Sequence, residues 1–138
     1  PAWADRAVMA RDLASFPKPA RAFQQTFEQA MARWLGGDHD HEYRETWPAF
    51  RARVLAALDT LIERADGADV LVSTSGGPIA VIAQHLLALS DAKTLEVNNV
   101  IANASVSRVL YSGPRRTLAV FNNYSHLEAE DPALVTYR

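Results

Sequence analysis

A short apolar run, a glycine-rich turn and an apolar helix follow one another in the middle of the chain, and this succession constrains the fold most strongly. Residues 70–72 read Val-Leu-Val without interruption, which predicts a strand buried on both faces. Residues 73–78 form the turn, and residues 79–89 predict a helix with few polar positions. A strand, a glycine turn and a helix in this order indicate an α/β domain.

Helices are predicted mainly before this unit and strands after it. The Pro-Lys-Pro break at residues 17–19 divides two helices, and Thr46 is a suitable N-cap for a third. The predicted elements are helices at residues 4–13, 20–35 and 46–65, a polar loop at 38–44, an irregular stretch at 91–103, strands at 105–111 and 117–122 joined as an antiparallel hairpin, and a polar surface tail at 124–138.

Two of the predicted helices carry an apolar face. The face of the helix at residues 20–35 predicts core packing rather than a cofactor site. It consists of Phe23, Phe27, Ala30, Met31 and Trp34. In the helix at residues 46–65 the apolar arc also contains Arg51, which breaks the pattern. Arg51 either extends its long side chain past its neighbours to solvent or faces an anion, and we favour the first interpretation.

Length and composition exclude several classes of protein. The chain has 138 residues, which is enough for the core of one domain, and a net charge of -2, which predicts neither nucleic-acid nor membrane binding. It contains no cysteine, so disulfides, thiolate nucleophiles and cysteine-ligated zinc are excluded. Its longest apolar stretch, residues 78–89, is too short to span a bilayer, and no signal-peptide pattern is present. We expect a soluble, cytoplasmic protein.

The glycine turn is the strongest candidate for a binding site. Ser75, Gly76 and Gly77 lie where free N–H groups and the positive end of the helix dipole favour an anion such as phosphate. The turn is not a Walker loop, a GxGxxG fingerprint or a GxSxG nucleophile elbow. A purely structural turn remains equally open. A serine hydrolase would need a base and an acid near Ser75, for which His85 and His126 are the candidate bases.

Two other polar clusters are weaker candidates. The loop Asp38–Glu42 offers two histidines and three acids, but no third ligand of fixed spacing, so we interpret it as a solvated loop and expect no metal and no cofactor. Asparagines are dense at positions 98, 99, 103, 122 and 123, and side-chain bonds to turns explain most of them. Asn103, directly before a predicted strand, is kept as a phosphate-binding candidate.

The order of these features resembles the C-terminal part of the histidine phosphatase superfamily, which includes the phosphoglycerate mutases. The resemblance is clearest from Glu45 to Leu127 and extends more faintly to about Ala20. The matching pieces are Glu45-Thr46 with Arg53-Val54, residues 70–79, residues 103–108 and residues 121–127. The resemblance implies a three-layer α/β/α, phosphoglycerate mutase-like fold that lacks its N-terminal strand.

The resemblance implies which catalytic residues to expect, and this sequence lacks them. Such enzymes transfer a phosphoryl group to the histidine of an Arg-His-Gly motif that follows the first strand, and a second histidine precedes the two glycines. The present chain contains no Arg-His-Gly, and Ser75 holds the place of the second histidine, as in a Thr-Ser-Gly-Gly subgroup. No catalytic residue is therefore intact, and the expected phosphate-binding residues are Ser75, Gly76, Gly77 and Asn103.

We expect residues 1–138 to form a single domain that is the C-terminal part of a longer histidine-phosphatase-like domain. The parent protein is then a phosphomonoesterase that acts on a small phosphorylated metabolite, its expected partners are a small phosphorylated molecule or inorganic phosphate, and the chain alone is inactive. An alternative is a non-catalytic relative that serves as a binding or oligomerisation module, and the oligomeric state stays open. A third interpretation is an unrelated α/β domain that binds sugar phosphates.

Overall fold

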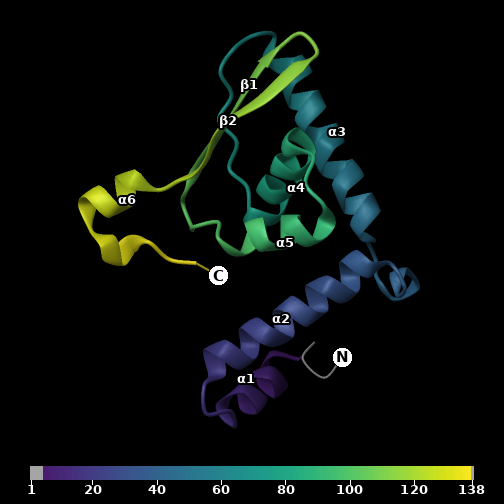
Figure 1. Ribbon diagram of the computed structural model, residues 1–138, viewed down its shortest axis with the longest axis vertical. Coiled ribbons are helices and arrows are strands. Elements are labelled where there is room, and N and C mark those ends of the chain that lie inside the picture. The colour runs from purple at the N-terminus through teal and green to yellow at the C-terminus, as the bar shows by residue number, and fades with distance from the viewer. Residues whose placement is uncertain (1–4, 138) are drawn as a thin grey trace. The chain divides into compact units, whose positions relative to one another are not determined.

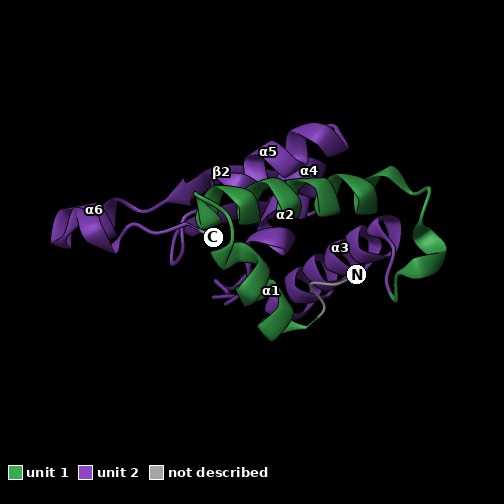
Figure 2. Cartoon of the chain, turned by 90° about the horizontal axis from the view of Figure 1, so that it is seen from below, with its two compact units in different colours: residues 1–44 green, residues 45–138 purple. Residues whose placement is uncertain are grey.

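The computed structural model describes residues 5–137 and divides the chain into two compact units, Pro1–Arg44 and Glu45–Arg138 (Figure 2). None of the helices in the described part of the chain combines the length and the apolar character that crossing a membrane requires.

The first unit consists of two helices and a short turn. Helix α1 (Arg6–Ala14) begins after Asp5, whose Oδ1 accepts hydrogen bonds from the N–H groups of Ala7 and Val8 at 2.7 and 3.3 Å. Helix α2 (Pro19–Gly36) ends at Gly37, where φ is 78°. Both predicted helices are thus confirmed, although Ala4 lies outside the described residues. The predicted polar loop contains the 3-10 turn η2 (Asp40–Glu42).

The apolar stripe of α2 does not pack in a core, so that prediction is wrong. No residue of α2 is buried, and Phe23 is 38% exposed. Phe23 and Phe27 instead stack on one another, with ring centroids 6.3 Å apart. The physical reason is size, because the two helices of this unit cannot enclose a stripe on all sides.

The second unit has a core built around one central helix. Helix α4 (Gly76–Leu87) packs against α3 (Trp47–Ala65), α5 (Asp91–Asn99) and strand β2 (Arg115–Asn123), an arrangement that Figure 1 shows. The remaining elements are β1 (Val106–Ser112), α6 (Ser125–Glu130) and the 3-10 turn η3 (Pro132–Leu134). The buried apolar residues are Trp47, Val54, Ala80, Val81, Ala83, Ile101 and Ala102.

Local signals place the ends of these helices. Thr46 caps α3 as predicted, since its Oγ1 accepts a hydrogen bond from the N–H of Ala49 at 3.3 Å. The prediction of an irregular stretch at residues 91–103 is wrong for its first part, which is α5. Ser90 caps α5 through the N–H of Lys93 at 3.2 Å, and the apolar periodicity of this helix is too weak to have predicted it.

The predicted hairpin is confirmed. Strands β1 and β2 form a two-stranded antiparallel sheet in which Leu110 pairs with Thr117 and Ser112 with Arg115. Gly113, with φ of 55°, allows the tight turn between them. Strand β2 of the hairpin contacts α4. The α/β class is therefore confirmed.

The apolar run at residues 70–72 is not a buried strand, which corrects the central prediction. The exposed fractions of Val70, Leu71 and Val72 are 48%, 99% and 50%, and the run belongs to neither strand of the described sheet. A hydrogen bond of 2.6 Å from the Tyr111 hydroxyl to the carbonyl of Ala68 holds only the start of the segment. An extended segment of this kind lacks the neighbouring strand that would bury it.

Candidate phosphate-binding turn

Ser75 and the two glycines after it form the N-terminus of α4. Ser75 is the N-cap residue, in extended conformation (φ -103°, ψ 171°), and its hydroxyl makes no capping hydrogen bond. Its carbonyl accepts a 3.4 Å bond from Ile79, so the helix begins here. The N–H groups of Gly76 and Gly77 precede the first intrahelical bond, so they have no acceptor within α4. The turn is therefore a candidate anion site, in which the Ser75 hydroxyl and these two amides would be the donors.

The ring of Phe50 lies beside Gly77. A Cβ atom at this position would lie 3.4 Å from Cζ and 3.8 Å from Cε1 of Phe50, which is on α3. A Cβ atom at Gly77 would therefore make an ordinary van der Waals contact with the Phe50 ring, where α3 approaches the first turn of α4. The neighbouring Gly76 is itself buried. Phe50 is consequently the side chain that backs the glycine turn.

An ion pair lies over the same aromatic ring. Glu45 accepts hydrogen bonds from Nε and Nη2 of Arg53 at 2.6 and 2.8 Å, in a two-pronged arrangement. The Arg53 guanidinium carbon lies 5.2 Å from the centroid of the Phe50 ring. The hydrogen bonds from Arg53 lower the pKa of Glu45 from its ordinary value of 4.5. Glu45 is therefore ionised at neutral pH.

The structure places Asn103 in a structural contact. Its N–H donates to the carbonyl of Thr136 at 2.8 Å, and its Nδ2 donates to Oγ1 of Thr136 at 3.1 Å. These bonds attach the C-terminal segment to the connection before β1. No described contact joins Asn103 to the turn at Ser75, and its role in phosphate binding stays a prediction.

Asn122 has a larger structural role than the sequence indicated. Its backbone has a positive φ of 53°. Its Oδ1 accepts the N–H of Ala102 at 2.8 Å, and its Nδ2 donates to the carbonyl of Val100 at 2.7 Å. The Asn122 N–H donates to the Ser107 hydroxyl at 3.0 Å. Asn122 thereby fixes the connection from α5 to β1, and the only sequence signal is that asparagine tolerates positive φ better than most residues.

Arg51 covers an aromatic ring and faces a carboxylate of its own chain. Its guanidinium carbon lies 6.0 Å from the Trp47 ring centroid, and its Nη1 lies 3.8 Å from Oδ1 of Asp91. The same oxygen accepts a 2.6 Å bond from Nε2 of Gln84, which is 3% exposed. Arg51 therefore belongs to a polar junction of α3, α4 and α5.

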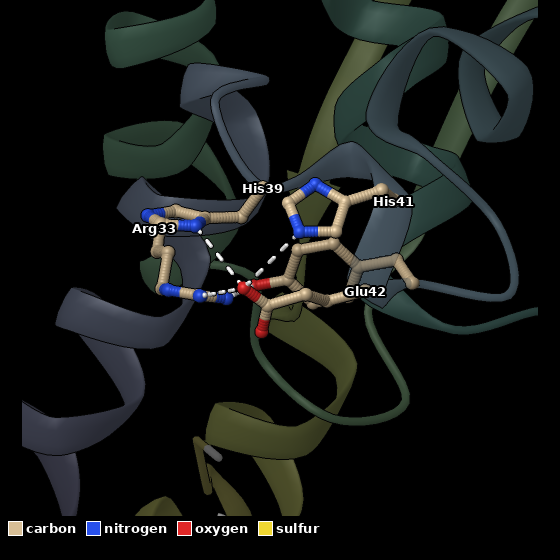
Figure 3. A network of polar contacts seen from close by, with 5 residues as sticks. Arg33, His39, His41 and Glu42 are labelled. Carbon is tan, nitrogen blue, oxygen red and sulfur yellow. Dashed lines mark hydrogen bonds and ion pairs between the residues drawn. The ribbon is translucent and has the colours of Figure 1, made fainter.

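The polar loop after α2 is organised around one carboxylate. Figure 3 shows that Arg33, His39 and His41 converge on Glu42. Their nitrogens Nη2, Nδ1 and Nε2 lie 2.7, 3.2 and 3.9 Å from its Oε1, respectively. The hydrogen bond from Arg33 lowers the pKa of Glu42. Within the described residues, no group of three or more histidine, aspartate or glutamate side chains is placed to hold a metal ion.

The geometry of α4 excludes one candidate base for a serine hydrolase. Ser75 lies at the N-cap position of α4, whereas His85 lies near the end of this helix. Ten residues of α-helix extend for about 15 Å, which is too far for a hydrogen bond between the two side chains. His126 lies on α6, and no described contact joins it to Ser75.

The second unit is an α/β arrangement in which Ser75, Gly76 and Gly77 form the N-terminus of the central helix. A family model described as histidine phosphatase superfamily (branch 1) matches residues 11–124. The chain belongs to the histidine phosphatase superfamily, and its α/β fold is consistent with a phosphoglycerate mutase-like fold. No curated protein and no solved structure matches the chain.

This membership confirms the resemblance seen in the sequence and extends it. The match starts at residue 11, within α1, and so includes α2 as well as the whole glycine turn. It also contradicts the third interpretation, that of an unrelated sugar-phosphate-binding domain.

Proposed function

We propose that this chain is the C-terminal part of a histidine-phosphatase-like domain whose full-length protein hydrolyses a phosphate monoester of a small metabolite. Ser75, Gly76 and Gly77 form one wall of the phosphate pocket in this proposal. The observation that carries it is the turn itself, because the Ser75 hydroxyl makes no capping bond and the two glycine amides lie at the start of α4 in a chain that belongs to this superfamily.

In the proposed chemistry this chain supplies hydrogen-bond donors to the phosphate, and residues outside it supply the nucleophile. A histidine nucleophile attacks phosphorus, and hydrogen-bond donors stabilise the charge on the transferred oxygens. Ser75 replaces the second histidine with a neutral donor, and the two glycine amides supply the remaining donors here. The nucleophile has to come from a segment other than residues 1–138, since these contain no Arg-His-Gly.

The exposed apolar segment at residues 70–72 supports this division. We propose that a strand elsewhere in the full-length polypeptide pairs with it and brings the nucleophile beside Ser75. Three consecutive apolar side chains, of which Leu71 is 99% exposed, are otherwise costly to leave in water and invite aggregation. The segment leads directly into the glycine turn, so a strand paired with it would end near the phosphate pocket.

Leu71→Asp tests the pairing. In the 138-residue chain the free energy of unfolding should change by less than about 0.5 kcal/mol, because the side chain is already in water. In the full-length protein it should fall by roughly 2–4 kcal/mol, because a charge would be buried. Urea unfolding measures both values. Leu134→Asp, at a second exposed leucine, is the control, and equal small effects of Leu71→Asp in the two proteins would exclude a covering strand.

Anion titration tests the pocket. Inorganic phosphate or vanadate added to the full-length protein should shift the amide NMR signals of Gly76 and Gly77 at millimolar concentration. Ser75→Ala should weaken the affinity roughly fivefold to tenfold, the effect of losing one hydrogen bond of about 1 kcal/mol. Ser112→Ala, at an exposed serine at the end of β1, should leave the affinity unchanged. The absence of any shift at Gly76 and Gly77 would refute the pocket.

A non-catalytic binding or oligomerisation module is the second candidate function. The observation that favours it is Ser75, which stands where the superfamily's second histidine is expected. Activity of the full-length protein separates the two candidates. We further propose a cytoplasmic location, for which the lack of cysteine is the supporting observation.

A further inference from the structure

We propose that Glu45 and Arg53 are positioning residues for the phosphate-binding turn, and that they act on it through the ring of Phe50. This inference rests on the proposed function of Ser75, Gly76 and Gly77 as a phosphate site. It adds a determinant on α3 to a site that otherwise belongs to α4.

The first step is the fixed geometry of the ion pair. Glu45 lies before α3 and Arg53 lies in the second turn of that helix, with two hydrogen bonds of 2.6 and 2.8 Å between them. Two parallel bonds restrict both the position and the plane of the guanidinium, which a single bond would not. The lowered pKa of Glu45 keeps this pair ionised throughout the neutral range.

The second step is the restraint of the Phe50 ring. Arg53 lies over it at 5.2 Å from the centroid, and Trp47 stacks with it at 6.0 Å and an interplanar angle of 27°. Trp47 is only 5% exposed and belongs to the core. A guanidinium above an aromatic face is attractive, so Arg53 and Trp47 together limit how Phe50 can rotate.

The third step is the contact between the ring and the turn. Cζ and Cε1 of Phe50 occupy the space beside Gly77, at 3.4 and 3.8 Å from the position of a Cβ atom. A glycine without a side chain to pack has more backbone freedom than other residues. The ring edge removes part of that freedom and so sets the directions of the Gly76 and Gly77 N–H groups. Preorganised donors bind an anion more tightly than mobile ones.

The experiment compares the variant Arg53→Met with a control variant, Arg33→Met, which breaks a similar ion pair in the first unit. Arg53→Met keeps much of the apolar stem and removes the guanidinium. Arg33→Met is the control, because Arg33 pairs with Glu42 at 2.7 Å and lies 5.8 Å from the Tyr43 ring in the first unit. In the full-length protein Arg53→Met should weaken inorganic phosphate binding roughly fivefold and speed amide exchange at Gly76 and Gly77. Arg33→Met should change neither quantity.

Phe50→Leu distinguishes positioning from direct contact between Arg53 and the anion. If Arg53 acts through the ring, Phe50→Leu should reproduce the loss of affinity, and the double variant should lose little more than either single variant. An unchanged affinity in Phe50→Leu, or additive losses, would overturn the proposal. So would Gly76 and Gly77 exchange rates in Arg53→Met equal to those of Arg33→Met.

A failure of the proposed function can be distinguished from a failure of this positioning role. If the unaltered full-length protein shows no phosphate response at the turn, the phosphate site itself is refuted. Amide exchange measured without phosphate then still decides whether Glu45 and Arg53 order Gly76 and Gly77. Arg53→Lys keeps the charge but not the two-pronged geometry, so its exchange rates should lie between those of the unaltered protein and those of Arg53→Met.

Discussion

Phosphatase activity of the full-length protein is expected to fall by several orders of magnitude when the histidine of an Arg-His-Gly sequence outside residues 1–138 is replaced by alanine. The 138-residue chain alone is expected to release no measurable p-nitrophenol from p-nitrophenyl phosphate. Both expectations have the same physical reason. Loss of a covalent nucleophile removes the reaction path itself, whereas loss of a binding residue only weakens one interaction.

The measurement is steady-state hydrolysis of p-nitrophenyl phosphate by the purified full-length protein, its histidine variant and the 138-residue chain. His85→Ala is a suitable control, because His85 is exposed near the end of α4, far from Ser75. Turnover by the 138-residue chain, free of contaminating phosphatase, would contradict the expectation. A full-length protein that binds phosphate at the turn but hydrolyses no phosphate monoester would identify a non-catalytic module instead.

Elements with strong local signals could be predicted from the sequence. The Pro-Lys-Pro break and the capping residue Thr46 placed the helices at nearly their observed bounds. The hairpin was predictable for a similar reason, since β1 and β2 are adjacent in sequence and Gly113 permits the turn between them. In each case the information lies within a few residues of the element it determines.

Features that depend on distant residues could not be predicted. An apolar run at residues 70–72 shows that a strand is possible there, but a strand forms only beside another strand, and the described sheet provides none. The apolar stripe of α2 likewise predicts which face of the helix could be buried. It does not predict whether another element covers that face. Helix α5 was missed for the opposite reason, because it has little apolar periodicity and depends on the Ser90 cap.

In the candidate site, too, the local features were predicted from the sequence and the contacts with distant residues were not. Ser75, Gly76 and Gly77 were identified from the sequence, and the structure places them at the start of α4 as expected. The contact between Gly77 and Phe50 was not visible, because Phe50 is distant in the sequence. The pairing of Glu45 with Arg53 was equally hidden, although both residues occur in the segments that resemble the superfamily.

Asn122→Ala is expected to lower the free energy of unfolding by about 2–4 kcal/mol. The substitution removes the bonds to the N–H of Ala102 and the carbonyl of Val100, each of which contributes about 1 kcal/mol, and it leaves polar backbone groups without partners. It also places alanine at a φ of 53°, which adds roughly 1 kcal/mol of strain. Urea denaturation followed by circular dichroism measures the loss.

Three further variants separate these contributions. Asn122→Gly relieves the backbone strain of Asn122→Ala but does not restore the lost hydrogen bonds. It should therefore be roughly 1 kcal/mol more stable than Asn122→Ala. Asn122→Asp keeps an acceptor for Ala102 and loses the donor to Val100, which predicts an intermediate stability. Asn123→Ala removes only an exposed 3.1 Å bond to the N–H of Ser125 and should cost less than about 1 kcal/mol. If Asn122→Ala were no more destabilising than Asn123→Ala, the connection from α5 to β1 would be held by its buried residues Ile101 and Ala102, and not by this asparagine.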